Sequence, residues 1–215
     1  GSNCTKDAVA YCERAKKAGA DAVLVVTPYY NKPSDEGIYH HFEAVSKVGI
    51  PVVVYNIQGR TGRNIETSLL ERIVQLPNMV AVKEASGNVS QMMDVIAKIK
   101  LKNPDFAVLS GDDSLSLPLI AAGGDGVISV VSNIAPTEVT NLVQSALNDD
   151  MSKARELHYK LLPFFKAAFV DGNPSSIKYA MSTKGMIKPC VRLPLVEVKE
   201  SAKSVIENAL KECNL

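Results

Sequence analysis

Five short apolar runs recur along the chain at the spacing of a strand and helix unit. They begin at residues 22, 51, 79, 106 and 127, so consecutive starts lie 29, 28, 27 and 21 residues apart. This is the length of one βα unit. Both faces of each run are apolar, which is typical of parallel strands covered on both sides. The predicted strands are Ala22–Val26, Pro51–Tyr55, Met79–Lys83, Phe106–Ser110 and Val127–Val131.

Amphipathic helical patterns fill the intervals, and the pattern changes after residue 150. Several helices end at clear stop signals, such as Gly19, Gly49 and Pro77. Residues 151–171, 174–185 and 197–213 predict helices with no strand between them. We therefore expect an α/β body over residues 1–150 and a C-terminal helical region over residues 151–215.

Five parallel strands leave two architectures open. A closed (β/α)8 barrel needs eight strands, and the chain also begins with a helix rather than a strand. The residues alone fit either an open doubly wound sheet or a barrel whose first strands are absent.

Composition excludes several classes of protein. The formal net charge is +1 and no basic cluster is present, which argues against nucleic acid binding. No apolar run reaches the roughly 18 residues of a membrane span, and no secretory signal is visible. The four cysteines lack CxxC spacing, which favours reduced thiols in a cytoplasmic protein over a metal site.

Polar residues stand at the C-terminal ends of the strands, where α/β folds place their sites. Lys83 ends the third strand, and an unprotonated lysine there could attack a carbonyl and form a Schiff base. The alternative is a structural lysine that pairs with Glu84 or extends its amine to solvent.

Two tyrosines and an arginine follow neighbouring strands. The hydroxyl of Tyr55 or Tyr30 could pass a proton, or each ring could simply be a half-buried aromatic residue. Arg60 lies in a turn between Gly59 and Gly62, where its guanidinium could bind a substrate carboxylate or remain solvated.

Other polar groups have structural explanations. Asp112 and Asp113 fit turn and helix-capping roles better than a metal pair, because no further ligand lies at a fixed offset. The GGDG segment at 123–126 lacks the full dinucleotide spacing and predicts a tight turn before a strand. The three histidines show no metal-ligand spacing, so no metal site is expected.

Taken together, these segments resemble the dihydrodipicolinate synthase and N-acetylneuraminate lyase family of class I aldolases. The resemblance covers the whole chain in order, and the Arg60-Thr61-Gly62 turn is similar to the synthase branch. The matching segments are VVTPYYNKPSDEGIYHHF, VVVYNIQGRTG, VAVKEASGN, LSGDD, GGDGVISV and NPSSIKYA.

The resemblance implies a role for each of several residues. Lys83 would form the Schiff base with pyruvate, Tyr55 would relay protons, and Tyr30 would complete the relay across a subunit interface. Arg60 would bind the carboxylate of L-aspartate 4-semialdehyde. Ile128, through its backbone carbonyl, and Gly111 would line the substrate site. No cofactor is implied beyond the covalent Schiff base, and the implied product is 4-hydroxy-tetrahydrodipicolinate, a precursor of lysine and diaminopimelate.

The resemblance also implies an architecture and an assembly. The fold would be a TIM (β/α)8 barrel that lacks about its first three strands, so that residues 1–150 supply strands 4–8, with a C-terminal helical region after them. The assembly would be a homotetramer built from tight dimers, with no nucleic acid or membrane partner. Asn3 and Tyr29 match positions of a feedback site for lysine, and Asp7 stands where a glutamate is usual in that site.

Two other functions remain open at this stage. A second aldolase would keep the Schiff base but use a sialic acid or a 2-keto-3-deoxy sugar. A non-catalytic paralogue would keep Lys83 by descent alone. Arg60 favours the synthase, because a small charged aldehyde needs a partner for its carboxylate.

Overall fold

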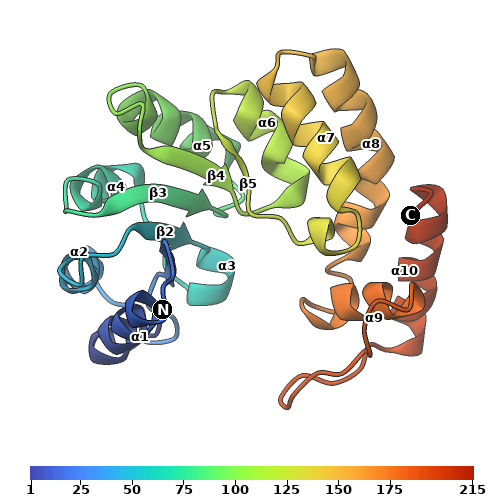
Figure 1. Cartoon of the computed structure of the whole chain (residues 1–215), viewed down its shortest axis with the longest axis horizontal. Coiled ribbons are helices and arrows are strands. Elements are labelled where there is room, and N and C mark those ends of the chain that lie inside the picture. Colours follow the sequence, from blue (N-terminus) through green and yellow to red (C-terminus); the bar gives the residue numbers. More distant parts are fainter. The chain divides into compact units, whose positions relative to one another are not determined.

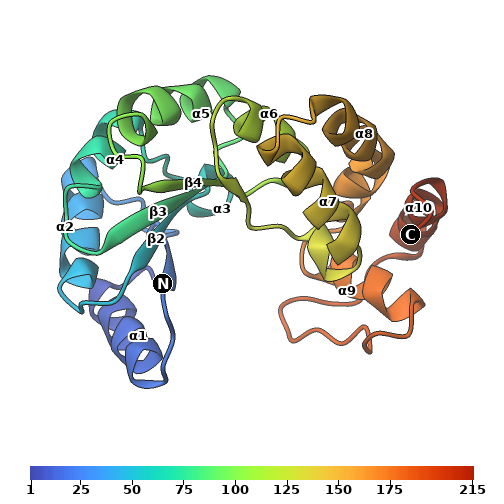
Figure 2. The same ribbon diagram turned by 45° about the horizontal axis from the view of Figure 1, so that its top comes forward.

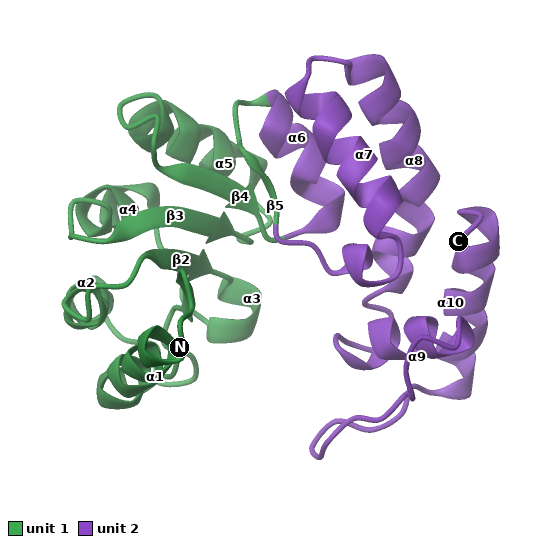
Figure 3. Cartoon of the chain, in the orientation of Figure 1, with its two compact units in different colours: residues 1–111, 122–127 green, residues 112–121, 128–215 purple.

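The computed structural model describes residues 1–215, and the chain divides into two compact units (Figure 3). Unit 1 comprises residues 1–111 and 122–127, and unit 2 comprises residues 112–121 and 128–215. The strands of unit 1 are β1 (Val23–Val26), β2 (Val52–Asn56), β3 (Met79–Glu84), β4 (Ala107–Ser110) and β5 (Gly126–Val127). Its helices are α1 (Thr5–Lys17), α2 (Asp35–Ser46), α3 (Gln58–Thr61), α4 (Thr67–Ile73) and α5 (Val89–Val95), which continues as a π-helical turn over Ile96–Lys100.

The sheet of unit 1 is wound in one direction. All neighbouring strands are parallel, and their order is β1-β2-β3-β4-β5 (Figures 1 and 2). A doubly wound sheet reverses its strand order at a switch point, whereas a barrel does not. The uninterrupted order therefore favours the barrel type of winding over the doubly wound alternative.

The predicted strands are confirmed within two residues for β1 to β4, but the fifth prediction is wrong. The strand expected at Val127–Val131 is only Gly126–Val127, and Val131–Asn133 form a 3₁₀ turn. The carboxylate of Asp113 accepts hydrogen bonds from the backbone N–H groups of Val130 (2.9 Å) and Val131 (3.2 Å). These N–H groups therefore cannot form the hydrogen bonds of a β-ladder, although the apolar sequence of residues 127–131 is typical of a strand.

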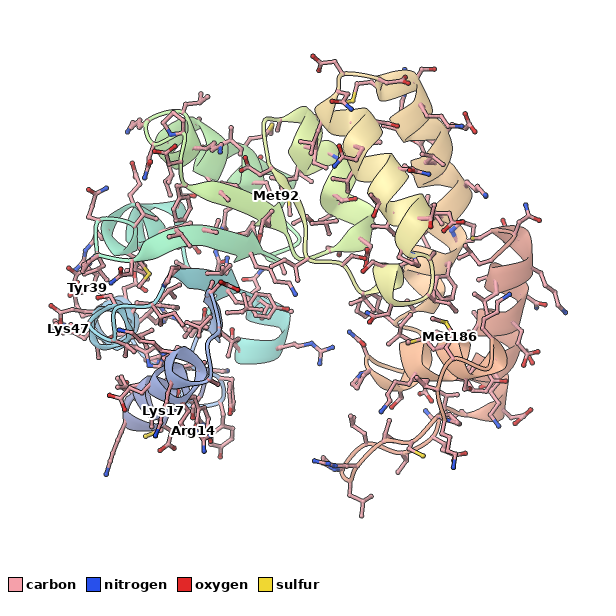
Figure 4. The ribbon with its side chains drawn as sticks, in the orientation of Figure 1. Arg14, Lys17, Tyr39, Lys47, Met92 and Met186 are labelled. Carbon is pink, nitrogen blue, oxygen red and sulfur yellow. The ribbon has the colours of Figure 1, made fainter.

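One face of the sheet carries the core of unit 1. Val25, Val54, Val82 and Val108 form a row of registered neighbours, each 0% exposed. Burial of each contributes about 1.5 kcal/mol or more. Helices α2, α4 and α5 cover this face (Figures 1 and 2), and Met92 of α5, labelled in Figure 4, is fully buried there.

The opposite face of the sheet is only partly buried. It carries the neighbouring row Val26, Tyr55, Lys83 and Leu109, each of intermediate exposure. The prediction that both faces are covered was therefore wrong for this chain. The sequence pattern alone does not reveal this, because Val and Leu occupy both faces.

Unit 2 consists of helices and turns. Its helices are α6 (Ser116–Ala121), α7 (Pro136–Leu147), α8 (Met151–Ala167), α9 (Ser175–Thr183) and α10 (Glu200–Glu212), with 3₁₀ turns at Asp113–Leu115 and Val131–Asn133. The three helices predicted after residue 150 are thus present as α8, α9 and α10. Leu117, Ile120, Ala146 and Ala154 form a buried cluster that joins α6, α7 and α8. No helix of the chain combines the length and apolarity that crossing a bilayer requires.

A buried histidine in α2 generates a prediction about pH. His41 is 1% exposed; its Nδ1 lies 3.0 Å from the hydroxyl of Thr5, and its Nε2 has no hydrogen-bond partner. Burial lowers its pKa from 6.5 to about 4, because desolvation disfavours the charged imidazolium. The folded protein therefore binds fewer protons at this site than the unfolded chain between these pH values.

We expect the contribution of His41 to the free energy of unfolding to be fully present above pH 6.5. It should be lost as the pH drops toward 4, which lowers the free energy of unfolding by up to about 3 kcal/mol. Denaturant titrations at a series of pH values measure this slope. His41→Leu should flatten the slope, whereas Phe42→Leu, at the neighbouring buried position, should lower stability at every pH and keep the slope. An unchanged slope in His41→Leu would contradict the assignment.

Candidate active site

Lys83 and Tyr55 form a pair at the C-terminal ends of two adjacent strands. They are registered partners of β3 and β2, and the Lys83 Nζ lies 4.5 Å from the centroid of the Tyr55 ring. An ammonium at this distance is attracted to the ring face. Two side chains that the sequence placed at separate strand ends are thus brought together on the partly buried face of the sheet.

The Tyr55 hydroxyl has an altered acidity. Burial raises its pKa above 10, and the positive charge of Arg60 partly offsets this increase. The phenol therefore remains protonated at neutral pH and can donate a proton. The Arg60 charge thus acts on the Tyr55 hydroxyl.

Arg60 lies on α3, a single helical turn that follows β2 directly. The predicted turn is thus a short helix, which ends where Gly62 adopts φ 75° and donates its N–H to the Gln58 carbonyl at 2.8 Å. The Gln58 side chain donates to the Ser86 carbonyl at 3.2 Å, which ties α3 to the loop after β3. The Arg60 side chain is exposed, which fits both the substrate-binding role and the solvated alternative.

Gly111 provides room for Lys83. A Cβ at this position would lie 3.1 Å from both Cγ and Cε of Lys83 and 2.6 Å from the Ala85 Cβ. The Gly111 N–H also donates to the Glu84 carbonyl at 2.7 Å. A side chain at 111 would clash with Ala85 and crowd Lys83, so the structure gives Gly111 a steric function beside Lys83.

The alternative in which Lys83 pairs with Glu84 is not what the structure shows. Successive side chains of a strand point to opposite faces, and Glu84 is 0% exposed on the helix-covered face. Its carboxyl oxygens accept hydrogen bonds from the Asn56 amide (3.0 Å) and the Ser86 N–H (2.7 Å).

Sequence reasoning named Glu84 only as a possible partner of Lys83 and missed its hydrogen bond with Asn56. The signal was present, because each of these strands ends in two consecutive polar residues, Tyr55-Asn56 and Lys83-Glu84. When two neighbouring strand residues are both polar, one of them must face the core and needs hydrogen-bond partners there.

Tyr30 lies after β1 and is 88% exposed, with φ 73°. The structure therefore does not bury it beside Tyr55 within this chain. Thr27, which sequence reasoning also missed, is 0% exposed and donates its hydroxyl to the Tyr55 carbonyl at 2.9 Å. Thr27 thus fixes the backbone of Tyr55.

The residues matched to a lysine site lie near the chain's first helix. The Asn31 amide donates to the Asn3 carbonyl at 2.9 Å, so Asn3 adjoins the segment that contains Tyr29. Tyr29 is 41% exposed, and Asp7 is exposed in the first turn of α1.

Ile128 belongs to unit 2, where Asp113 anchors the residues that follow it. Asp113 is 2% exposed and accepts hydrogen bonds from the Ser129 hydroxyl and from the backbone of Val130 and Val131. Asp112 accepts a hydrogen bond from the Ser114 N–H at 2.8 Å. The helix-capping role is confirmed for Asp112, whereas Asp113 holds the backbone of a turn distant in the sequence.

The GGDG segment is a turn before β5, as predicted. Gly123 and Gly126 have φ 106° and 148°, backbone values that favour glycine. The Asp125 carboxylate accepts hydrogen bonds from the Lys100 ammonium at 2.8 Å and from the Val108 N–H at 2.7 Å. The segment therefore holds the start of β4 in place.

Comparisons with known proteins agree with this arrangement. The model of the dihydrodipicolinate synthetase family matches residues 1–213. A protein of Protochlamydia amoebophila named 4-hydroxy-tetrahydrodipicolinate synthase is 48% identical over 213 residues, which cover 99% of this chain and 71% of the relative.

Two solved structures illustrate the likeness in three dimensions. Dihydrodipicolinate synthase from Thermotoga maritima superposes with a TM-score of 0.97 at 42% identity, over 100% of this chain and 73% of that one. The Acinetobacter baumannii enzyme, described as chloride inhibited and complexed with pyruvate, gives a TM-score of 0.95 at 37% identity, over 100% of this chain and 73% of that one. The chain thus belongs to the dihydrodipicolinate synthetase family.

Proposed function

We propose that this chain is a class I aldolase that condenses pyruvate with L-aspartate 4-semialdehyde to 4-hydroxy-tetrahydrodipicolinate. The observation that carries the proposal is the registered pair of Lys83 and Tyr55, with the amine 4.5 Å from the ring centroid and Gly111 leaving room beside it. The names of the relatives favour this reaction over a sugar aldolase, and a pyruvate complex is known for one of them.

The chemistry follows from the amine. The Lys83 Nζ attacks the C2 carbonyl of pyruvate, water leaves, and an iminium ion forms. The iminium draws electrons from the methyl carbon, which loses a proton and becomes an enamine. The enamine carbon then adds to the aldehyde carbon of the second substrate, and the aldehyde oxygen takes a proton. The amino group of that substrate then attacks C2 and displaces the Lys83 amine, which closes the ring and releases the product.

Each proton transfer needs a group near the lysine. The Tyr55 hydroxyl is protonated at neutral pH, because burial raises its pKa, and the centroid of the ring that carries it lies 4.5 Å from the amine. Tyr55 is therefore the proton donor and acceptor next to the reacting atoms, and Tyr30 extends the relay across a subunit interface. No metal or redox cofactor takes part in these steps.

The remaining groups bind the substrates. Arg60, exposed on α3 and close enough to affect the Tyr55 hydroxyl, binds the carboxylate of the semialdehyde. Gly111, beside Lys83, lines the pyruvate pocket. The family resemblance assigns a contact with pyruvate to the backbone carbonyl of Ile128, in the segment held by Asp113. Asn3, Asp7 and Tyr29 form part of a feedback site for lysine.

The architecture proposed for the site is a (β/α)8 barrel. Residues 1–150 supply strands 4–8 and residues 151–215 a helical region, in a cytoplasmic homotetramer of tight dimers. The one-way strand order and the superposition on the Thermotoga maritima chain with a TM-score of 0.97 support the barrel.

The direct test is turnover with both substrates, with product formation followed in a coupled assay. We expect the chain, as part of its homotetramer, to form product at a rate that depends on both substrates. Formation of the pyruvate adduct without product would favour the non-catalytic paralogue, and turnover only with a sugar aldehyde would favour the second aldolase.

Lys83→Arg should abolish the covalent adduct with pyruvate, because a guanidinium is not deprotonated in a protein. Intact mass after borohydride reduction detects the adduct. Lys47→Arg, at an exposed position on the surface, should retain it. An adduct of unchanged yield in Lys83→Arg would show that another amine reacts.

Tyr55→Phe should lower kcat by about 10²-fold or more, because the ring remains but the proton relay is lost. Steady-state kinetics with both substrates measure the effect. Tyr39→Phe is the matched control, since Tyr39 contacts Arg72 on the outside of α2 and α4. An unchanged kcat in Tyr55→Phe would refute the relay.

Arg60→Ala should raise the KM for the semialdehyde roughly tenfold or more, because a hydrogen bond to a charged group contributes about 1.5–3 kcal/mol. The KM for pyruvate should change little. Arg63→Ala, which removes a neighbouring arginine paired with Asp35, should leave both values near those of the parent. An equal effect of Arg60→Ala on both substrates would contradict the assignment.

A further inference from the structure

A second registered pair lies one residue beyond Tyr55 and Lys83. Asn56 and Glu84 are neighbours across β2 and β3, and both side chains are 0% exposed. Because strand side chains alternate, this pair occupies the helix-covered face, directly behind the reactive pair.

The two buried side chains are joined and saturated by local donors. The Asn56 amide donates to one carboxyl oxygen of Glu84 at 3.0 Å, and the other oxygen accepts the Ser86 N–H at 2.7 Å. The Asn56 Oδ1 accepts the Ile65 N–H at 3.0 Å. Burying a carboxyl group at the end of a strand costs free energy of desolvation, even when an amide and a backbone N–H donate to it. We therefore expect this group to have a function.

The same two residues also tie three strand ends together through their backbone. The Asn56 carbonyl accepts the Ala85 N–H at 2.9 Å, and the Glu84 carbonyl accepts the Gly111 N–H at 2.7 Å. Lys83 lies between these ties, with the Tyr55 ring on one side and the Gly111 backbone on the other. A shift of Glu84 must therefore move Lys83.

A second layer of amides anchors the pair to the helices. Asn56 also donates to Asn64 at 2.8 Å, and Asn64 donates to Gln91 at 2.8 Å. Gln91 lies in the first turn of α5 and donates to the Ile65 carbonyl at 2.9 Å. The network thus runs from the α5 terminus to the residue next to Lys83.

We infer that the hydrogen-bonded pair of Asn56 and Glu84 is a positioning device that holds the Lys83 amine over the Tyr55 ring. Neither residue contacts the reacting atoms, so both act through Lys83. The inference rests on the proposed function for its catalytic meaning, but the position of the Lys83 amine is measurable without turnover.

The test is a set of three variants of the full chain. In Glu84→Gln, two amide NH₂ groups face each other and the hydrogen bond between residues 56 and 84 is lost. In Asn56→Asp, two carboxyl groups face each other and the same hydrogen bond is lost. The double variant restores one donor and one acceptor in reversed order, although the Asn64 amide must then turn over. Val54→Ala, a buried apolar position on β2, is the control for loss of stability alone.

The first readout is the reactivity of the amine. Trace acetylation at a series of pH values, followed by peptide mass spectrometry, gives a labelling profile for Lys83 beside exposed Lys17 and Lys47. We expect the Lys83 profile to differ from these references in the parent chain and in Val54→Ala. In each single variant, the Lys83 profile should become more like the profiles of Lys17 and Lys47. In the double variant, it should recover at least part of the difference seen in the parent chain.

The second readout is the rate of pyruvate adduct formation at increasing pyruvate concentration. Each single variant should lower the maximal rate by about tenfold to 100-fold, since a small misplacement of a reacting group has effects of this size. The concentration for half-maximal rate should change less.

The outcomes separate the two hypotheses. A Lys83 labelling profile that already matches Lys47 in the parent, or that does not move in Glu84→Gln, overturns the positioning role whatever pyruvate does. A profile that moves and recovers as expected, in a chain that never forms the pyruvate adduct, supports the positioning role and refutes the proposed function.

Discussion

Alternation of side chains at the ends of two adjacent parallel strands is the constraint on which the site depends. Registered strands bring Tyr55 beside Lys83 on one face and Asn56 beside Glu84 on the other. The first pair has a partly exposed amine and phenol, and the second has a buried carboxyl group with its donors. One sheet thus presents an amine and a phenol on one face and a buried, hydrogen-bonded pair on the other.

The apolar core makes this arrangement rigid. The row of valines across β1 to β4 precedes the polar row by two residues on the same face, and the helices that cover it include α5, whose first turn carries Gln91. Displacement of the strand ends would break both apolar contacts and buried hydrogen bonds. Since an unsatisfied buried polar group costs about 1–3 kcal/mol, the polar row makes the register more specific.

Much of the fold could be predicted from the sequence, because hydrophobic periodicity and helix stop signals are local. The four long strands and the three C-terminal helices follow from it. The fifth strand was mispredicted because Asp113, distant in sequence, takes the N–H groups of Val130 and Val131. The exposed second face of the sheet was missed because apolar residues line both faces, so composition does not distinguish them.

Within the site, the position of Lys83 at a strand end could be predicted, but its surroundings could not. The partner of Glu84 depends on register, which places Asn56 rather than Lys83 next to it. The steric role of Gly111 likewise depends on how closely β4 approaches β3. Such contacts between strands cannot be predicted from the spacing of residues along the sequence.

A crystal structure of the protein reduced with borohydride in the presence of pyruvate tests the central claim most directly. We predict continuous density from the Lys83 Nζ to C2 of the reduced pyruvate, with the Tyr55 hydroxyl beside it and the Asn56 and Glu84 hydrogen bond intact. Density for pyruvate on another lysine, or a Lys83 side chain directed away from Tyr55, would contradict it.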